Sequence, residues 1–385
     1  MSRIFKNYQF FCAVAVLIGT IVGAGIFGLP FVMARAGFGL GLFYLIILSG
    51  VVVLMHLAYG EIVLRTNQPH RLVGYAEKYL GKRAKIIATL VALFEYYGSL
   101  LAYIILGGEF LRIILSRFFG GSEVFWVLIF FALAAAAVGC GLKFISGGEL
   151  LMTLALIGIV ALLVIKGWPM IDRQNFSGTD WSNFFLPYGV ILFALAGSVA
   201  VPEMRQVLAG QEKKLKPAIF LGTVISAIIY FFFAWVVVGV AGLATSEDAI
   251  LGLVPYFGGW IVQTGAIFGL LAVYTSFIVL GLNLKNIYRK DYHLSEGLSF
   301  WLTCAVPLAA YLIGIKSFIL VIGFVGAVAA GLDGILTILI YLKAKKQGDR
   351  RPEYSLAGAK VFSGFLILIF SVGLIISLVY FLPTK

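Results

Sequence analysis

Long apolar stretches separated by short polar segments follow one another along the entire chain. Each stretch has roughly the 20 residues that an α-helix needs to cross a bilayer. Eleven such stretches can be recognised: residues 9–34, 39–65, 86–115, 124–141, 149–167, 184–208, 217–243, 259–288, 297–314, 317–342 and 358–382. The pattern predicts an all-α membrane protein in which residues 1–385 form one membrane domain.

Two of these stretches contain residues that weaken a helix in its middle. Residues 19–31 read GTIVGAGIFGLPF, and residues 186–204 read LPYGVILFALAGSVAVPEM. Glycine and proline are the weakest helix formers. Irregular backbone within a membrane is tolerated only where it faces protein or a water-filled cavity. We therefore predict helix interruptions at residues 19–25 and 194–198, both at mid-membrane.

The two interruptions lie about 175 residues apart, and the same offset relates the third, fourth and fifth spans to the eighth, ninth and tenth. This predicts two units of five helices, 9–167 and 184–342, with an eleventh helix at 358–382 outside the repeat. Because five is odd, the second unit enters the membrane from the opposite side. An inverted repeat whose units each open with a broken helix is typical of secondary transporters.

An unwound segment offers main-chain groups to a ligand. Free amides at the start of the half-helix 25–34 attract a carboxylate, and free carbonyls at the end of the preceding half-helix attract an ammonium group. A zwitterion fits between two such breaks, and glycines let it approach the main chain. The alternative is close helix packing, since Gly19 and Gly23 have the spacing of a helix-packing motif.

The composition agrees with a membrane protein. Of the residues, 62% are hydrophobic and 12% are charged, against about 25% charged residues in soluble domains. The formal net charge of +12 reflects topology, because most Lys and Arg residues fall in the segments expected on one side. Such residues favour the cytoplasm. This predicts a multi-pass inner-membrane protein with a cytoplasmic N-terminus and an external C-terminus, and it argues against nucleic-acid binding.

Other classes of function have little support. The three cysteines and three histidines lack the spacing of a metal site or a disulfide framework, so no cofactor is expected. No HExxH, GxSxG or P-loop motif occurs, so we do not expect an enzyme. A small-solute channel is the alternative to a carrier, because small residues also line pores. However, no repeated filter motif is present.

The broken segments also carry a family resemblance. Residues 19–38, GTIVGAGIFGLPFVMARAGF, resemble the first-span signature of the amino acid/auxin permease family, and residues 193–204, FALAGSVAVPEM, resemble prokaryotic amino acid permeases. That family belongs to the amino acid–polyamine–organocation superfamily, which shares the fold of the bacterial leucine transporter. The resemblance implies a protein of the lipid bilayer that binds an amino acid between its two broken helices.

The resemblance implies a set of substrate-binding residues. The substrate carboxylate would meet amides of the first break and the amine would meet carbonyls of both broken helices. An aromatic residue of span 3 would close the pocket, although a tyrosine at the membrane interface is the alternative. The expected binding residues are Ile18, Val22, Gly23, Ala24, Gly25, Tyr97, Tyr103, Phe193, Ala194, Gly197 and Ser198.

The resemblance also implies a coupling ion. In sodium-coupled members, one ion lies between the first break and two hydroxyl residues of span 8, where this chain has Thr275 and Ser276. The implied ligands are the carbonyls of Gly19, Val22 and Ala272 and these two hydroxyls, and five oxygens suit a hard cation. The alternative is that the hydroxyls bond to their own helix.

Ionisable residues within spans are further functional candidates. They are Glu61, Glu95, Glu203 and Asp333. We interpret Glu61 and Glu203 as parts of an inner salt-bridge gate, and Glu95 and Asp333 as either gates or proton carriers. Some proton-coupled relatives place a lysine in span 5, and residues 150–165 contain none. Sodium is therefore the expected ion and a proton is the alternative.

Together these patterns predict a secondary transporter that moves amino acids with an ion by alternating access. Neither broken segment carries an acid or a base beside its small residues. The substrate is therefore expected to be a neutral L-amino acid.

Overall fold

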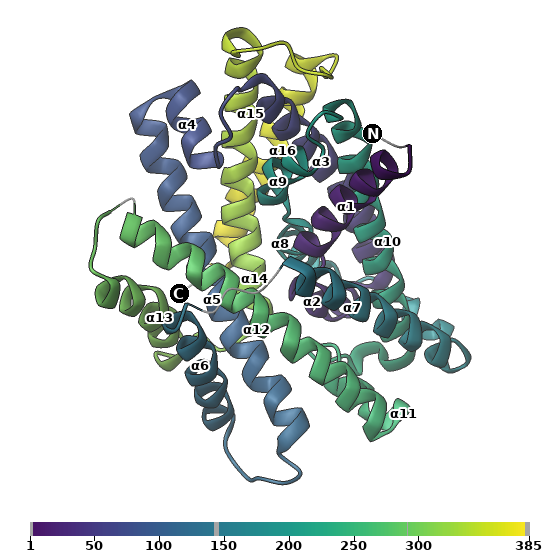
Figure 1. Ribbon diagram of the computed structural model, residues 1–385. Helices are drawn as coiled ribbons and strands as arrows, with labels where there is room; N and C mark the ends of the chain where they lie inside the picture. Colours follow the sequence, from purple (N-terminus) through teal and green to yellow (C-terminus); the bar gives the residue numbers. More distant parts are fainter. Residues whose placement is uncertain (1–2, 142–145, 291, 382–385) are drawn as a thin grey trace.

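The structure, a computed structural model, describes residues 3–141, 146–290 and 292–381, and no β-strand occurs in these ranges. Residue 382, the last of the predicted eleventh span, lies outside them. Helices account for most of the chain (Figure 1). The α-helices are α1 (Arg3–Ile21), α2 (Gly25–Ala36), α3 (Phe38–Arg65), α4 (Leu72–Leu80), α5 (Lys82–Leu115), α6 (Glu123–Gly139), α7 (Ser146–Gly167), α8 (Leu186–Leu195), α9 (Val201–Val207), α10 (Leu215–Ala241), α11 (Val254–Phe257), α12 (Gly259–Lys290), α13 (Glu296–Leu312), α14 (Phe318–Val325), α15 (Gly331–Gln347) and α16 (Ala359–Phe381).

Short helical turns complete the chain. The 3-10 turns are η1 (Trp168–Met170), η2 (Arg173–Phe176), η3 (Trp181–Asn183), η4 (Ser198–Ala200), η5 (Glu212–Lys214), η6 (Gly242–Ala244) and η7 (Leu251–Leu253), and a π-helical turn, η8 (Gly326–Ala330), joins α14 to α15. π-Helical turns inside longer helices are frequent at functional sites.

Helices occupy all eleven predicted stretches. Among the described residues, seven helices are long and apolar enough to cross a membrane, and the bent pair α1–α2 makes an eighth. The other three stretches hold shorter apolar helices: α6, α13 and residues 157–170, which comprise the end of α7 and η1. The chain is therefore an all-helical, multi-pass membrane protein.

Local sequence explains where several helices begin. Ser122, Ser295 and Ser317 each accept a hydrogen bond from a backbone amide three residues ahead, so they cap α6, α13 and α14. Pro187 and Pro202 lie in the first turns of α8 and α9, where no helical amide bond is lost.

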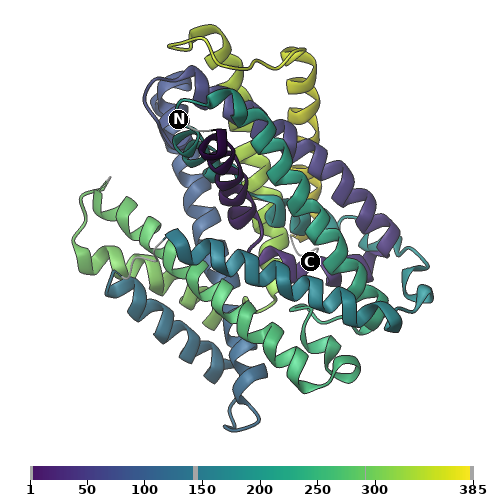
Figure 2. The ribbon, with the colours of Figure 1, turned by 45° about the vertical axis from the view of Figure 1, so that its right-hand side comes forward.

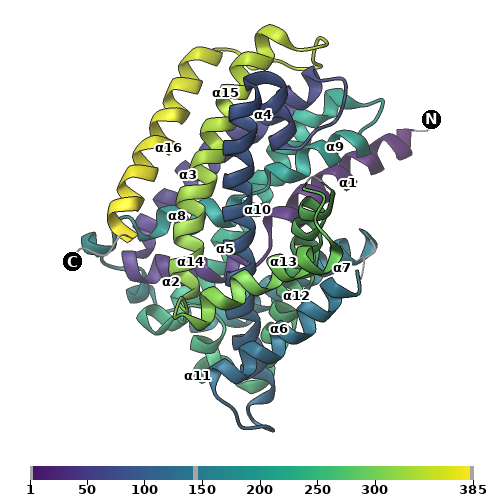
Figure 3. The same ribbon diagram turned by 90° about the vertical axis from the view of Figure 1, so that its left-hand side faces the viewer.

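The helices are arranged so that the broken ones lie inside. α5 packs against α12, α6 and α4, while α10 packs against α3 and α1. Figure 2 shows α1 in dark purple beside the teal α10. Figure 3 shows α16 along one side of the molecule, running away from the end that carries α4 and the N-terminus.

α8 approaches α14 and η8 unusually closely. A Cβ on Gly189 would lie 2.0 Å from the carbonyl oxygen of Gly323, and a Cβ on Gly326 would lie 2.0 Å from that of Gly189. Glycine is required at both positions because any side chain would collide with backbone. This contact fixes α8, the first half of the sixth span, against the tenth span.

Candidate functional site

The first span is broken between α1 and α2. The two helices meet at an angle of 58°, and residues 22–24 separate them. Helical bonding continues to Ile21, because the amide of Val22 donates to the carbonyl of Ile18 at 2.7 Å. The interruption is therefore shorter than the predicted range of 19–25, and Ile18 has no open carbonyl.

The break leaves the amide of Ala24 in a position to meet a ligand. The amide of Gly23 turns back to the carbonyl of Ile21 at 2.9 Å. The amide of Ala24 donates to no acceptor among the described residues, although Ala24 is 2% exposed. Buried amides are almost always paired, so this one, close to the start of α2, suits a carboxylate.

The sixth span is broken between α8 and α9. Ala196 and Gly197 are unwound, and η4 covers Ser198 to Ala200 before α9 starts. The carbonyl of Phe193 accepts the amide of Ala196 at 3.2 Å, so it is occupied within the chain. The interruption thus begins two residues later than the predicted 194–198.

The hydroxyl of Tyr230, in α10, lies between the two breaks. This residue was not predicted from the sequence. Its hydroxyl lies 2.6 Å from the carbonyl oxygen of Ile21 and 2.7 Å from that of Ala194. The side chain is fully buried. A tyrosine in the middle of the apolar span 217–243 was the available signal.

The glycines of the first break have different surroundings. A Cβ on Gly25 would lie 2.6 Å from the Cα of Ala194, so Gly25 is needed for packing between the two broken helices. A Cβ on Gly23 would have no atom within 4 Å. Open space is therefore found beside Gly23, while Gly197 packs against the side chain of Ile21.

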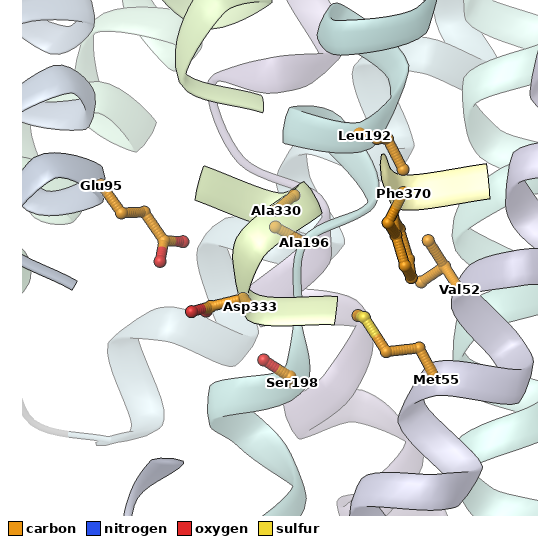
Figure 4. Close-up of a pocket in the computed structure, with 9 residues that line it drawn as sticks. All are labelled: Val52, Met55, Glu95, Leu192, Ala196, Ser198, Ala330, Asp333 and Phe370. Carbon is orange, nitrogen blue, oxygen red and sulfur yellow. The ribbon is translucent and has the colours of Figure 1, made fainter. Parts of the chain in front are cut away.

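A small cavity of about 20 Å³ lies beside the second break. Its walls include Ala196 and Ser198 of the broken span, Glu95 of α5 and Asp333 of α15. Figure 4 shows the carboxylates of Glu95 and Asp333 pointing toward each other, with Ser198 beside Asp333. The two acids interact electrostatically, and Oδ1 of Asp333 is buried without a hydrogen-bond partner among the described residues. The cavity has about the volume of one water molecule.

Glu61 lies in a contrasting environment. Its carboxylate is fully buried, accepts the Nε–H of Arg65 at 2.8 Å and the hydroxyl of Ser355 at 3.0 Å, and accepts the amide of Leu356 at 2.7 Å. We call residues 349–356, in the loop between α15 and α16, the clasp. Glu61 therefore connects α3 to the clasp, and its role as a gate stays a prediction.

The other acidic gate candidate, Glu203, lies in a different helix. Glu203 is exposed in the first turn of α9. Lys285 of α12, a basic residue within a span, pairs with Glu296 at 3.2 Å. The gating role of Glu203 stays a prediction.

The candidate sodium ligands are not brought together by their side chains. The hydroxyl of Thr275 donates to carbonyls of its own helix, at 3.0 Å to Leu271 and 3.1 Å to Ala272. Ser276 faces Tyr103 of α5. In the described part of the chain, α12 packs mainly against α5, α6, α7 and α13 rather than against α1, which carries Gly19, or the Val22 break.

The two span 3 tyrosines face different surroundings. Tyr97 shares a hydrogen bond with the hydroxyl of Tyr288 at 2.6 Å and lies 3.1 Å from the carbonyl of Leu302. It therefore faces α12 and α13, away from the breaks. Tyr103 interacts with Tyr230 and with Glu95, which places it near both the Tyr230 hydroxyl and the cavity.

Comparison with known proteins identifies the family. The sequence model of the tryptophan/tyrosine permease family matches residues 6–379. The chain belongs to this family. Tyrosine-specific transport system 1 of Haemophilus influenzae is 27% identical over 91% of this chain and 90% of its own length. Glutamine transporter 2 of Aliivibrio fischeri is 23% identical over 96% of this chain and 99% of its own length.

Solved structures show the fold of this permease. The manganese transporter of Eremococcus coleocola superposes with a TM-score of 0.73, covering 99% of this chain and 88% of its own, at 12% identity. MhsT in complex with L-phenylalanine superposes with a TM-score of 0.62, covering 98% of both chains, at 15% identity. These neighbours have the leucine-transporter-like fold, so the predicted 5+5 inverted repeat with two broken helices is confirmed.

The predicted family was wrong. The matching family is the tryptophan/tyrosine permeases, not the amino acid/auxin permeases. The resemblance rested on the glycine-rich break, and a break that exposes backbone to a ligand is a property of the fold. The broader prediction holds: the protein is a membrane permease for amino acids and not an enzyme. The boundaries 9–167 and 184–342 stay predictions.

Proposed function

We propose that the protein is a secondary carrier that moves aromatic amino acids across the inner membrane by alternating access. The observation that carries this proposal is the meeting of the two breaks. The carbonyls of Ile21 and Ala194 converge on Tyr230, while the Ala24 amide is unpaired and the space beside Gly23 is open. Such a site offers carbonyls to an ammonium group and an amide to a carboxylate.

The aromatic side chain is inferred from the relatives. The family is that of tryptophan and tyrosine permeases, and one relative is named a tyrosine-specific transport system. A glutamine transporter among the relatives makes glutamine the natural comparison substrate. All three amino acids are neutral, as expected from breaks without acidic or basic side chains.

Two coupling sites compete in this proposal. Sodium at Thr275 and Ser276 needs the Thr275 hydroxyl to leave its own helix and the first break to approach α12. A proton on the pair Glu95–Asp333 needs no rearrangement, because the acids already face each other across a cavity. Two carboxylates in a site of low dielectric repel, and a shared proton relieves this. We therefore favour proton coupling and keep sodium as the second candidate.

Uptake into proteoliposomes tests both parts. We expect L-tyrosine or L-tryptophan to accumulate with a proton gradient alone, and to exchange for internal substrate without any gradient. L-Glutamine serves as the substrate control. Accumulation driven only by sodium would reject proton coupling, and flux without saturation or exchange would reject a carrier.

The orientation is also proposed. The N-terminus and α4 lie at one end of the molecule (Figure 1), and the neighbouring loops are rich in Lys and Arg. This end is expected in the cytoplasm. Labelling of introduced cysteines at Asn67 and at Ser182 with a membrane-impermeant reagent in intact cells should modify only the second.

A further inference from the structure

The hydroxyl of Tyr230 lies between two carbonyl acceptors but has only one proton to donate. It lies at 2.6 Å and 2.7 Å from the carbonyl oxygens of Ile21 and Ala194. A phenol carries one proton and can satisfy only one of them well at a time. Both carbonyls lie at the ends of half-helices, where the helix dipole adds negative partial charge. The cluster is therefore electronegative and short of donors.

Room for a donor exists beside this cluster. A Cβ on Gly23, two residues from Ile21, would touch no atom within 4 Å. The amide of Ala24, which has no acceptor in the described part of the chain, follows directly. An electronegative cluster, open space and a free amide thus occur within four residues, in the order that an α-amino acid would need for its ammonium and carboxylate groups.

We propose that the Tyr230 hydroxyl stands in for the substrate's ammonium group in the empty carrier. It donates to the carbonyls of Ile21 and Ala194 until the α-ammonium takes them over. An ammonium group has three N–H donors, so it can serve both carbonyls at once and displaces the Tyr230 hydroxyl from them. Tyr230 is then a positioning residue that holds the two broken helices together when no substrate is bound. This inference rests on the proposed function.

The substitution Tyr230→Phe separates this role from simple packing. It keeps the ring but leaves the Ala194 carbonyl without the hydroxyl in the empty carrier, whereas the substrate supplies donors in the loaded one. Loss of a donor to a buried carbonyl should therefore favour the loaded state, lowering the Kd for L-tyrosine by about tenfold. Net uptake should slow, because the empty carrier must return, while substrate exchange persists.

Tyr274→Phe is the matched control. Tyr274 also lies within hydrogen-bonding distance of a carbonyl on another helix, at 3.4 Å from that of Leu133, but it lies outside the breaks. Its Kd and its ratio of net uptake to exchange should equal those of the wild type. A merely structural role for Tyr230 predicts lower thermal stability with no gain in affinity.

The outcomes are distinguishable. An unchanged or higher Kd in Tyr230→Phe, with wild-type protein binding L-tyrosine normally, overturns the inference and leaves the proposed function standing. If the wild type binds neither L-tyrosine nor L-tryptophan, the proposed function itself fails. One measurement needs no variant: 3-(4-hydroxyphenyl)propanoate, which lacks the ammonium group, should bind the wild type at least about 100-fold more weakly than L-tyrosine. Equal binding also overturns the inference.

Discussion

Two regions of this permease bury carboxylates in opposite ways. At the clasp, Glu61 is surrounded by donors from Arg65, Ser355 and Leu356. Beside the second break, Asp333 faces another acid, and one of its oxygens has no partner among the described residues. Buried polar groups are nearly always paired when their task is structural. We therefore expect Glu61 to stabilise the fold, and we propose that Asp333 takes part in transport.

The clasp is held by further bonds of the same kind. The hydroxyl of Tyr354 donates to the carbonyl of Leu57 at 2.6 Å, and the amide of Arg350 donates to the carbonyl of Arg65 at 3.2 Å. A Cβ on Gly60 would lie 2.3 Å from the Tyr354 oxygen, so Gly60 makes room for this contact. The clasp is thereby fixed along α3. At the breaks, by contrast, the carbonyls of Ile21 and Ala194 share the single hydroxyl of Tyr230.

The largest effect on stability is expected at Glu61. Glu61→Ala removes the acidic partner of Arg65 and leaves the Leu356 amide without its acceptor. Breaking a buried pair in this way costs about 3–5 kcal/mol. Glu77→Ala is the control, because Glu77 pairs with Lys85 at 2.8 Å with both side chains more than 40% exposed, and such pairs contribute about 0–1 kcal/mol. Thermal unfolding in detergent compares them, and equal losses would contradict the structural role of Glu61.

Asp333 is expected to show the reverse behaviour. Asp333→Asn removes a charge that faces another carboxylate, so the folded state should lose no stability. Accumulation of L-tyrosine under a proton gradient should fall by about tenfold or more, since an amide cannot carry the proton. Exchange of internal for external substrate should continue. Full proton-driven accumulation by the variant would show that the pair is not the coupling site.

Much of this contrast could be foreseen from sequence. Glycine and proline within apolar spans located both breaks to within a few residues, because their effect on a helix is local. The clasp and Tyr230 could not be foreseen, since their partners lie far away in the chain: Tyr354 bonds to Leu57, and Tyr230 bonds to Ile21. The particular amino acid was also inaccessible, because backbone groups bind the parts that all amino acids share.

The glycines of the first break sharpen the comparison further. Gly25→Ala places a Cβ 2.6 Å from the Cα of Ala194, so the two broken helices must separate at a cost of about 1–3 kcal/mol. Gly23→Ala meets no atom within 4 Å, and Gly23 is not among the glycines with positive φ. It should keep full stability and weaken L-tyrosine binding by about tenfold. Thermal unfolding in detergent and the Kd for L-tyrosine, measured for both variants, test these two expectations. Unchanged affinity in Gly23→Ala would mean that the substrate lies elsewhere.

The smallest effect is expected at the exposed edge of the clasp. Asp349 lies 2.5 Å from Nζ of Lys78 and accepts the amide of Asn67, and the hydrogen bond from Lys78 lowers the pKa of the Asp349 carboxyl. A lowered pKa in the folded state means that the pair adds stability above the ordinary carboxyl pKa of about 3.9. This stability is lost as the pH falls through the folded value.

Asp349→Asn keeps an acceptor for Asn67 and removes only the charge. The variant should lose about 0.5 kcal/mol at pH 7. Wild type and variant should converge in acid as Asp349 is protonated, and 1 M salt should also reduce their difference. A loss as large as that of Glu61→Ala, or one independent of pH, would show that this edge of the clasp resembles its buried centre.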